Sequence, residues 1–495
     1  MKKIQNNSWL LLLAWTVLTI SMLSSCHKDL DIKNENNPVY ADIFDEPDDA
    51  YNIGSIGFFR WWQVQTTSVS PRMAMWTAAD QGTCSWANSG MWHLSDEPRR
   101  PFNNDVSYTY ASITSNYYSK MYGILKDMNE IQKKIKGGMD FGSKKKNKLM
   151  DAYTQFIQGI SLGYLGLVFD QAVIITENTT DPLALRPQPY DVVLDTAIAR
   201  LENVVNICEH SHFKLPDTWI NGDQYDEDEL AELARSFIVR FTVFRARNKA
   251  QNDQTDWQKV LDLSKKGIQK PLAPYIDNNQ WFCYYKHYTT SRSGWARIDC
   301  RIINLMDPGY PSRFPDDGIN PPAASSNDAR LNAYFNFASS NNMKPERGYV
   351  HYSNYEFSRY PYTTNPGDAG NVVDFPVVEN DLYRAEANAR LGHLPEAISI
   401  INAGTRVTAG QLAPLPDDAS QEDILDAIFY ERDIELIQTG FGTAFFDMRR
   451  RDYLQKGTPL HFPVPGRELQ VLQMPNYSFG GVGNADGINT SNGGW

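Results

Sequence analysis

The strongest constraint on the fold is a series of helical hydrophobic repeats separated by long stretches that have no period. In segment 149–169, apolar residues recur at spacings of three and four, which is typical of one face of an amphipathic helix. These residues are Tyr153, Phe156, Ile157, Ile160 and Tyr164. The same spacing recurs in 190–208, and 226–248 opens with an acidic first turn that suits a helix N-terminus. Segment 256–268 follows as a short partner helix.

A helical pair is predicted in the C-terminal part, over residues 379–407. Ala385 and Ala389 lie on one face of its first helix, Gly392 ends that helix, and Pro395 begins the next one. Another helix follows at 421–438. Small alanines at the contact allow the two helices to approach closely, as in tetratricopeptide (TPR) units, although no strict period of about 34 residues is present.

The stretches between the helices are rich in Pro, Gly, Asn and aromatic residues. Loops this long in a compact protein are usually functional. We therefore expect an all-α, TPR-like scaffold with helices over about 120–268 and 379–438 and a few short strands. Long irregular ligand-binding loops are expected at 63–118 and 271–378. The stretch from about 452 to 495 also lacks a period, and its last part, 480–495, is expected to be a flexible end.

The N-terminus predicts export. Lys2 and Lys3 precede an apolar run over 9–23 that is shorter than the roughly 20 residues of a transmembrane helix. Leu23-Ser24-Ser25-Cys26 is similar to the lipobox of bacterial lipoproteins, in which the cysteine is acylated and becomes the mature N-terminus. We expect a signal peptide at 1–25, a lipidated tether at 26–40 and a single domain at 41–495. The alternative is an ordinary signal peptide with a cysteine nearby.

Charge and cysteine content narrow the function classes. The formal net charge is −12, and the largest basic cluster is the lysine run at 144–146, so nucleic-acid binding is not expected. Cys84, Cys208, Cys283 and Cys300 allow three disulfide pairings, but isolated buried thiols are the simpler expectation in a chain of this size. Cys208 alternates with two histidines, His210 and His212, without a fourth ligand. We expect neither a metal site nor a cofactor.

Several segments, taken in their order along the chain, resemble the SusD/RagB family of outer-membrane nutrient-binding lipoproteins. The lipobox and the helical pair fit this family. Segment 430–450, "YERDIELIQTGFGTAFFDMRR", is similar to the family's E-R-x-x-E-L helix and the aromatic-Asp-Leu-Arg-Arg segment after it. "FPVPGRE" at 462–468 is similar to the family's I-P-x-x-E. The family's Glu-Gly-basic step and its Asn-Pro-Gly-Tyr ending are missing, so the resemblance implies a divergent branch.

The resemblance implies a TPR-like protein, anchored by lipid in the cell outer membrane and exposed at the surface. It would bind a glycan without catalysis and deliver it to a SusC-like TonB-dependent transporter. The charged C-terminal motif is interpreted as structural, with buried or half-buried ion pairs that fix the last helix and turn. Its residues are Glu431, Arg432, Glu435, Asp447 and Arg450.

Two aromatic-rich loops are the candidate ligand site. Sugar rings stack on flat aromatic side chains, and their hydroxyl groups bind planar polar partners. The early loop offers Trp86 and Trp92 beside Asn88 and Asn103, and the central one, 281–295, holds six aromatic residues in fifteen. The candidates there are Trp281, Tyr284, Tyr285 and Trp295. Core packing is the alternative for each ring, and it is the expectation for Phe58, Phe59, Trp61 and Trp62.

Two other functions stay open. A glycosidase needs two carboxylates at a defined separation, and the chain has 59 acidic residues but no hydrolase motif. A TPR-like envelope lipoprotein could instead bind peptides or organise other proteins, and RagB-like members suggest peptides as ligands. Exposed loop aromatics favour a small ligand.

Overall fold

The computed structural model describes residues 40–84, 88–181, 184–291, 296–339, 352–360, 369–485 and 489–495. Cys26 and the expected signal peptide lie outside these ranges. Within the ranges, none of the helices carries an apolar run that would let it cross a membrane.

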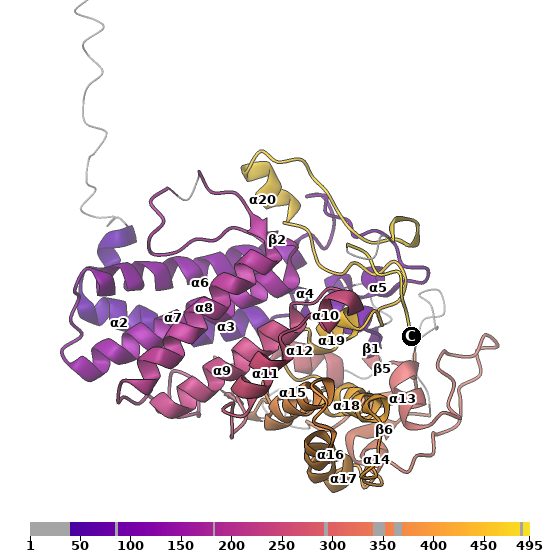
Figure 1. Cartoon of the computed structure of the whole chain (residues 1–495). Helices are drawn as coiled ribbons and strands as arrows, with labels where there is room; N and C mark the ends of the chain where they lie inside the picture. The colour runs from indigo at the N-terminus through magenta and orange to yellow at the C-terminus, as the bar shows by residue number, and fades with distance from the viewer. Residues whose placement is uncertain are drawn as a thin grey trace, which may run out of the picture.

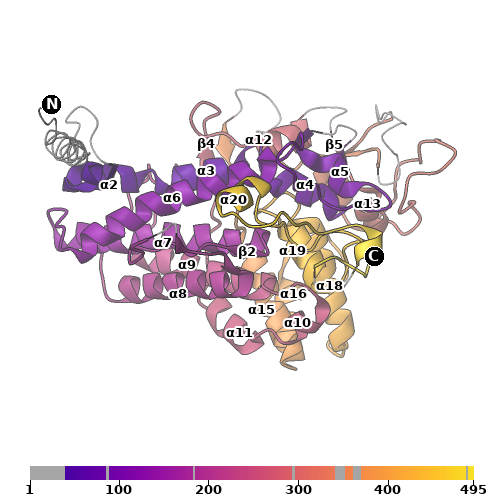
Figure 2. The same cartoon turned by 90° about the horizontal axis from the view of Figure 1, so that it is seen from above.

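The N-terminal half is a stack of antiparallel helices (Figures 1 and 2). Its helices are α2 (Pro47–Ser55), α3 (Gly57–Thr66), α4 (Pro71–Ala78), α5 (Met91–Ser95), α6 (Ser112–Lys136), α7 (Lys144–Val168), α8 (Tyr190–Glu209), α9 (Glu227–Phe244), α10 (Lys249–Asp253) and α11 (Trp257–Ser264). Helix α7 is central: it packs against α6 and α8, and α8 packs against α9. The periodic segments of the sequence correspond to α7, α8, α9 and α11, so the all-α expectation is confirmed.

Caps set where the long helices begin. The Ser143 hydroxyl accepts a hydrogen bond from the backbone N–H of Lys146 at 3.2 Å and starts α7. At α9, Asp226 and Glu229 form a reciprocal capping box.

The C-terminal half forms a second group of helices. It contains α12 (Tyr284–Lys286), α13 (Cys300–Met306), α14 (Arg330–Tyr334), α15 (Val377–Arg390), α16 (Leu394–Ala403), α17 (Thr405–Thr408), α18 (Gln421–Glu435), α19 (Thr443–Arg450) and α20 (Gly466–Val471). Helices α15, α16 and α18 bury a small apolar cluster of their own, in which Ala385 and Ala389 are fully enclosed. The predicted helical pair is α15–α16, and Gly392 makes its turn with φ +82°.

Four short antiparallel strand pairs lie among the described residues. They are β1 (Gly82–Cys84) with β5 (Ala296–Ile298), β2 (Gln171–Ala172) with β3 (Gln188–Pro189), β4 (Tyr275–Ile276) with β8 (Gly370–Asn371), and β6 (Phe335–Phe337) with β7 (Tyr355–Phe357). Two of them, β1–β5 and β4–β8, join parts of the chain that are far apart in sequence.

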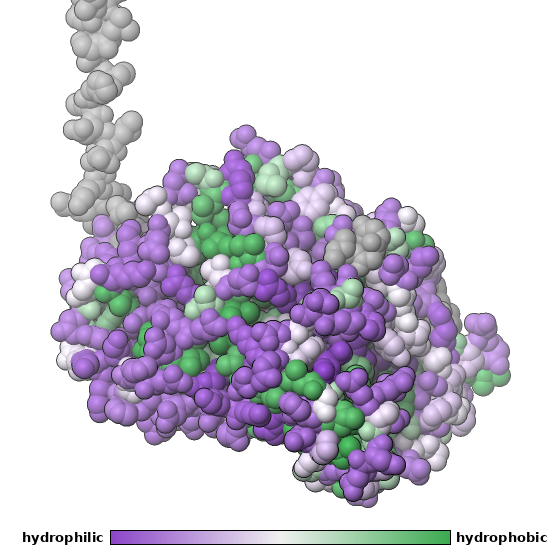
Figure 3. Space-filling model, viewed as in Figure 1, coloured by the Kyte–Doolittle hydropathy of each residue, from purple (hydrophilic) through white to green (hydrophobic). Residues whose placement is uncertain are grey.

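The stretches that were expected to be irregular carry some short structure. Segment 63–118 contains α4, β1, α5 and the first turns of α6, and 271–378 contains α12, α13 and α14. These elements are too short to show a hydrophobic period. The molecular face in Figure 3 is mostly hydrophilic, with small hydrophobic areas between polar side chains.

Candidate functional site

Two of the predicted ligand contacts lie in the core. Trp281 is 7% exposed, and its ring packs against Phe59, with the centroids 4.9 Å apart, and against Phe58 at 6.4 Å. Tyr285 is 3% exposed, with the Arg72 guanidinium 4.1 Å from its ring centroid. An enclosed ring offers no free face to a sugar, so neither residue suits stacking. Their segment lacks a period because it packs as a short irregular cap over α3.

The neighbouring rings form an accessible aromatic cluster, defined here as Phe282, Tyr284, His287 and Tyr288. Tyr284 is 45% exposed, and the other three are half-buried. The Phe282 and Tyr284 centroids are 4.3 Å apart, and Tyr284 lies nearly parallel to Tyr288, at 18° and 6.3 Å. These rings lie in and beside helix α12, and Tyr284 is the most exposed of the four.

In the early loop, the predicted contacts that the structure describes differ in their exposure to solvent. The Trp92 side chain is half-buried and packs against His93, with the centroids 5.6 Å apart. Asn103 is exposed, and its Oδ1 accepts the backbone N–H of Asp105 at 2.9 Å. Trp86 and Trp295 lie outside the described residues, as does the side chain of Asn88.

The two predicted loops meet at one small sheet. Cys84, the last described residue before the segment with Trp86, is the antiparallel partner of Ala296, the first described residue after the segment with Trp295. The strand pair β1–β5 therefore joins the early and the central loop, which no sequence pattern indicated.

The five residues of the charged C-terminal motif are buried in two ion-pair clusters. In the first, Arg330 forms a fork to Glu431, with N–O distances of 2.7 and 2.8 Å, and lies 3.4 Å from Glu435. In the second, Arg450 donates to both carboxylate oxygens of Glu386 at 2.7 Å and to Asp447 at 2.6 Å. Arg432 completes the second cluster at 3.1 Å from Glu386 and 3.4 Å from Asp447.

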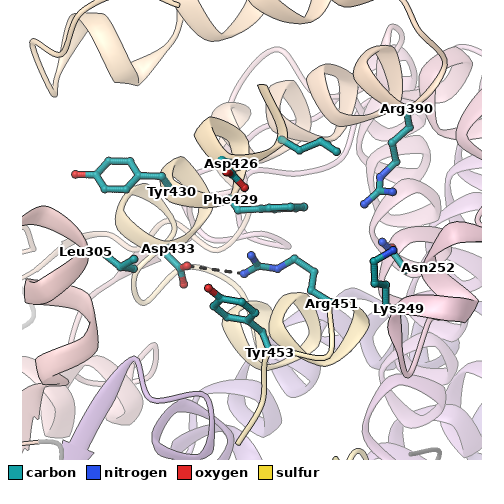
Figure 4. A pocket seen from close by; sticks show the side chains of 11 residues that line it. Lys249, Asn252, Leu305, Arg390, Asp426, Phe429, Tyr430, Asp433, Arg451 and Tyr453 are labelled. Atoms are coloured by element: carbon teal, nitrogen blue, oxygen red, sulfur yellow. Dashed lines mark ion pairs between the residues drawn. The ribbon is translucent and has the colours of Figure 1, made fainter. Parts of the chain in front are cut away.

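A pocket that the sequence did not reveal lies beside the second cluster (Figure 4). Its volume is about 470 Å³. It is lined by Lys249 and Asn252 of α10, Leu305 of α13, Arg390 of α15, Leu425, Asp426, Phe429, Tyr430 and Asp433 of α18, and Arg451 and Tyr453 after α19. Leu425, Phe429 and Asp433 follow each other at spacings of four on one face of α18. That spacing is the only sequence signal that could have indicated this wall.

An arginine sandwich forms one wall of the pocket. The Arg451 guanidinium lies between the rings of Phe429 and Tyr453, 4.2 and 5.0 Å from their centroids (Figure 4). Its Nη2 is 3.0 Å from Asp447 and 3.8 Å from Asp433. Stacking and ion pairing together hold this guanidinium in place.

The segment with alternating Cys and His does not form a ligand set. Burial raises the pKa of Cys208 to about 12, and His212 pairs instead with Glu227 at 2.7 Å. Across the described part of the chain, no group of three or more His, Cys, Asp and Glu side chains is arranged to hold a metal ion. Cys208, Cys283 and Cys300 are buried free thiols.

Comparisons with known proteins identify the fold. No protein-family model and no curated protein matches the sequence. Among solved structures, a SusD superfamily protein from Bacteroides vulgatus aligns with TM-score 0.60 and 14% identity, over 86% of this chain and 97% of that one. A SusD superfamily protein from Parabacteroides distasonis aligns with TM-score 0.61 and 13% identity, over 86% and 97%. A SusD-like carbohydrate-binding protein from B. vulgatus aligns with TM-score 0.54 and 17% identity, over 82% and 83%. The chain has the SusD-like fold that its motifs predicted.

Proposed function

We propose that this chain, which has the SusD-like fold, is a non-catalytic, lipid-anchored glycan-binding protein of the cell outer membrane. It delivers its ligand to a SusC-like TonB-dependent transporter. The observation that carries the proposal is the accessible aromatic cluster around Tyr284, on a fold shared with proteins described as carbohydrate-binding.

The proposed binding mode is stacking plus hydrogen bonding. The faces of Tyr284 and Tyr288 pack against the apolar C–H face of a sugar ring. The Tyr284 hydroxyl and planar polar groups on the two loops then bind the sugar hydroxyls. Trp86, Trp92, Asn88, Asn103 and Trp295 remain proposed contacts of this site, while Trp281 and Tyr285 support it from the core.

The test uses the soluble chain from residue 27 onward in native gels cast with different neutral polysaccharides, with reducing-sugar release assayed in parallel. We expect retardation on at least one polymer without release of sugar. Release would instead indicate a glycosidase, and no retardation on any polymer would favour a peptide ligand or a scaffold role.

A substitution in the aromatic cluster tests whether the glycan binds there. Tyr284→Ala should abolish most of the retardation, because a stacked ring contributes about 1 kcal/mol or more to such contacts. Phe337 of β6 is the matched control, because its ring is 42% exposed and lies outside both the aromatic cluster and the pocket of Figure 4. Phe337→Ala should leave the retardation unchanged. Circular dichroism should show the same helix content in both variants, and equal retardation of the two would contradict this site.

A further inference from the structure

We propose that the pocket of Figure 4 is a second ligand site, which takes a single sugar unit that carries a carboxylate. It is separate from the aromatic cluster and does not depend on it. The pocket volume of about 470 Å³ lies within the range of small-molecule sites, about 300–1,000 Å³.

The first observation is an apolar wall with accessible rings. Phe429 is half-buried and Tyr453 is 38% exposed, and Arg451 lies between them. Leu305 and Leu425, both partly exposed, extend this wall. Because the guanidinium is fixed on one face of Phe429, the remaining apolar surface is rigid and can pack against the C–H face of a pyranose.

The second observation is a cationic rim opposite that wall. Lys249 and Arg390 lie together on one side of the pocket in Figure 4. Both pair with one carboxylate, that of Asp253, at 2.8 Å from Lys249 and 3.6 Å from Arg390. Arg390 also donates to Glu386 at 2.9 Å, but the fork of Arg450 already binds both oxygens of that carboxylate.

Lys249 and Arg390 therefore have more N–H donors than their acidic partners, Asp253 and Glu386, can accept. The Lys249 ammonium has three N–H donors, and its side chain is 65% exposed. A ligand carboxylate at this rim would bind Lys249 and the guanidinium of Arg390, a group whose planar fork matches a carboxylate. Asp426, exposed on the α18 side, is an acceptor suited to sugar hydroxyls. Apolar wall, cationic rim and acceptor together match the groups of a uronic acid.

The test is an NMR titration of the chain from residue 27 with D-glucuronate and, separately, with D-glucose, using saturation transfer to detect the bound sugar. We expect saturable binding of glucuronate and much weaker binding of glucose. Lys249→Met should weaken glucuronate binding about fivefold, the size of one partly exposed ion pair, and the loss should shrink at high salt.

Lys259→Met is the matched control. Lys259 also pairs with one carboxylate, Glu202, at 2.8 Å, and it lies outside the pocket. This variant should bind glucuronate like the unmodified chain, whereas Tyr453→Ala should weaken binding. Equal binding of both sugars, no binding of either, or equal effects of the two lysine variants would overturn the proposal, whatever the native gels show.

Discussion

At the residue scale, Glu386 of α15 is a buried carboxylate whose charge the fold depends on. Burial alone would raise its pKa, but Arg450, followed by Arg432 and Arg390, outweighs burial and lowers the pKa to about 2. Because the folded value lies below the ordinary 4.5, the ionised group stabilises the fold above about pH 4.5. This contribution is lost as the pH falls from there through about 2.

Glu386→Gln should lower the free energy of unfolding at pH 7 by about 3 kcal/mol, because it leaves buried arginines without their partner. Urea unfolding measures this loss. At pH 3.5 the gap between the variant and the unmodified chain should narrow by about 1 kcal/mol, because the unfolded carboxyl is then mostly protonated. The exposed Glu396 supplies a control, and Glu396→Gln should match the unmodified chain at both pH values. A difference in the free energy of unfolding that is larger at pH 3.5 than at pH 7 would contradict the lowered pKa of Glu386.

The role of a residue could be predicted where it belonged to a motif with a fixed order of residues. It could not be predicted where the residue type was the only information. The order of Glu431, Arg432 and Glu435 along one helix indicated buried ion pairs, and the structure has these residues buried and paired. For Trp281 and Tyr284 the residue type was equally suggestive, yet one ring is 7% exposed and the other 45%. Exposure depends on which distant helix covers a loop, and no local pattern contains that information.

At the element scale, α7 approaches its neighbours closely because glycines replace side chains at the contacts. A Cβ at Gly163 would overlap the ring of Phe241 on α9, and one at Gly159 would lie 2.7 Å from Leu201 on α8. Gly123 of α6 is half-buried but has room for a side chain, because the nearest atom to an added Cβ would be 3.6 Å away, in Arg60.

The same substitution should therefore have opposite effects at two helical glycines. Gly163→Ala should lower the free energy of unfolding by about 2 kcal/mol, because the ring of Phe241 must move in a packed core. Gly123→Ala should raise it by up to about 1 kcal/mol, because alanine is the better helix former and meets no clash. Chemical denaturation of both variants checks this, and a stabilised Gly163→Ala chain would show that α7 and α9 are farther apart than described.

Elements were predictable where an apolar period extends over several turns, and the shortest elements were not predictable. Helices α7, α8 and α15 repeat their apolar residues over several turns, which identifies them. Strands such as β1 and β5 are three residues long and pair across a separation of more than two hundred residues. Such strands have too few residues for an alternating pattern, so the pairing that joins the two candidate loops was visible only in three dimensions.

At the scale of the whole molecule, the fold supplies a helical support, and its irregular segments contribute both buried rings such as Trp281 and exposed rings such as Tyr284. The helices of the N-terminal half and the group α15, α16 and α18 could be predicted from the helical period of their apolar residues. The pocket of Figure 4 arises only where α10, α13, α15 and α18 meet, because its lining comes from four helices and the segment after α19. A site assembled in this way cannot be predicted from any single segment.

The last prediction concerns where the whole molecule resides. If Cys26 is acylated, the chain expressed with its N-terminus in a bacterium with a lipoprotein pathway should partition into the detergent phase and incorporate radiolabelled palmitate. Attached acyl chains supply about 0.8 kcal/mol per buried CH₂, enough for stable anchoring when more than one is present. Cys26→Ala should abolish the label. Ser25→Ala, which keeps a small residue beside the cysteine, should retain it. Palmitate label retained by Cys26→Ala would show that acylation occurs elsewhere on the chain, and the lipoprotein proposal would fail.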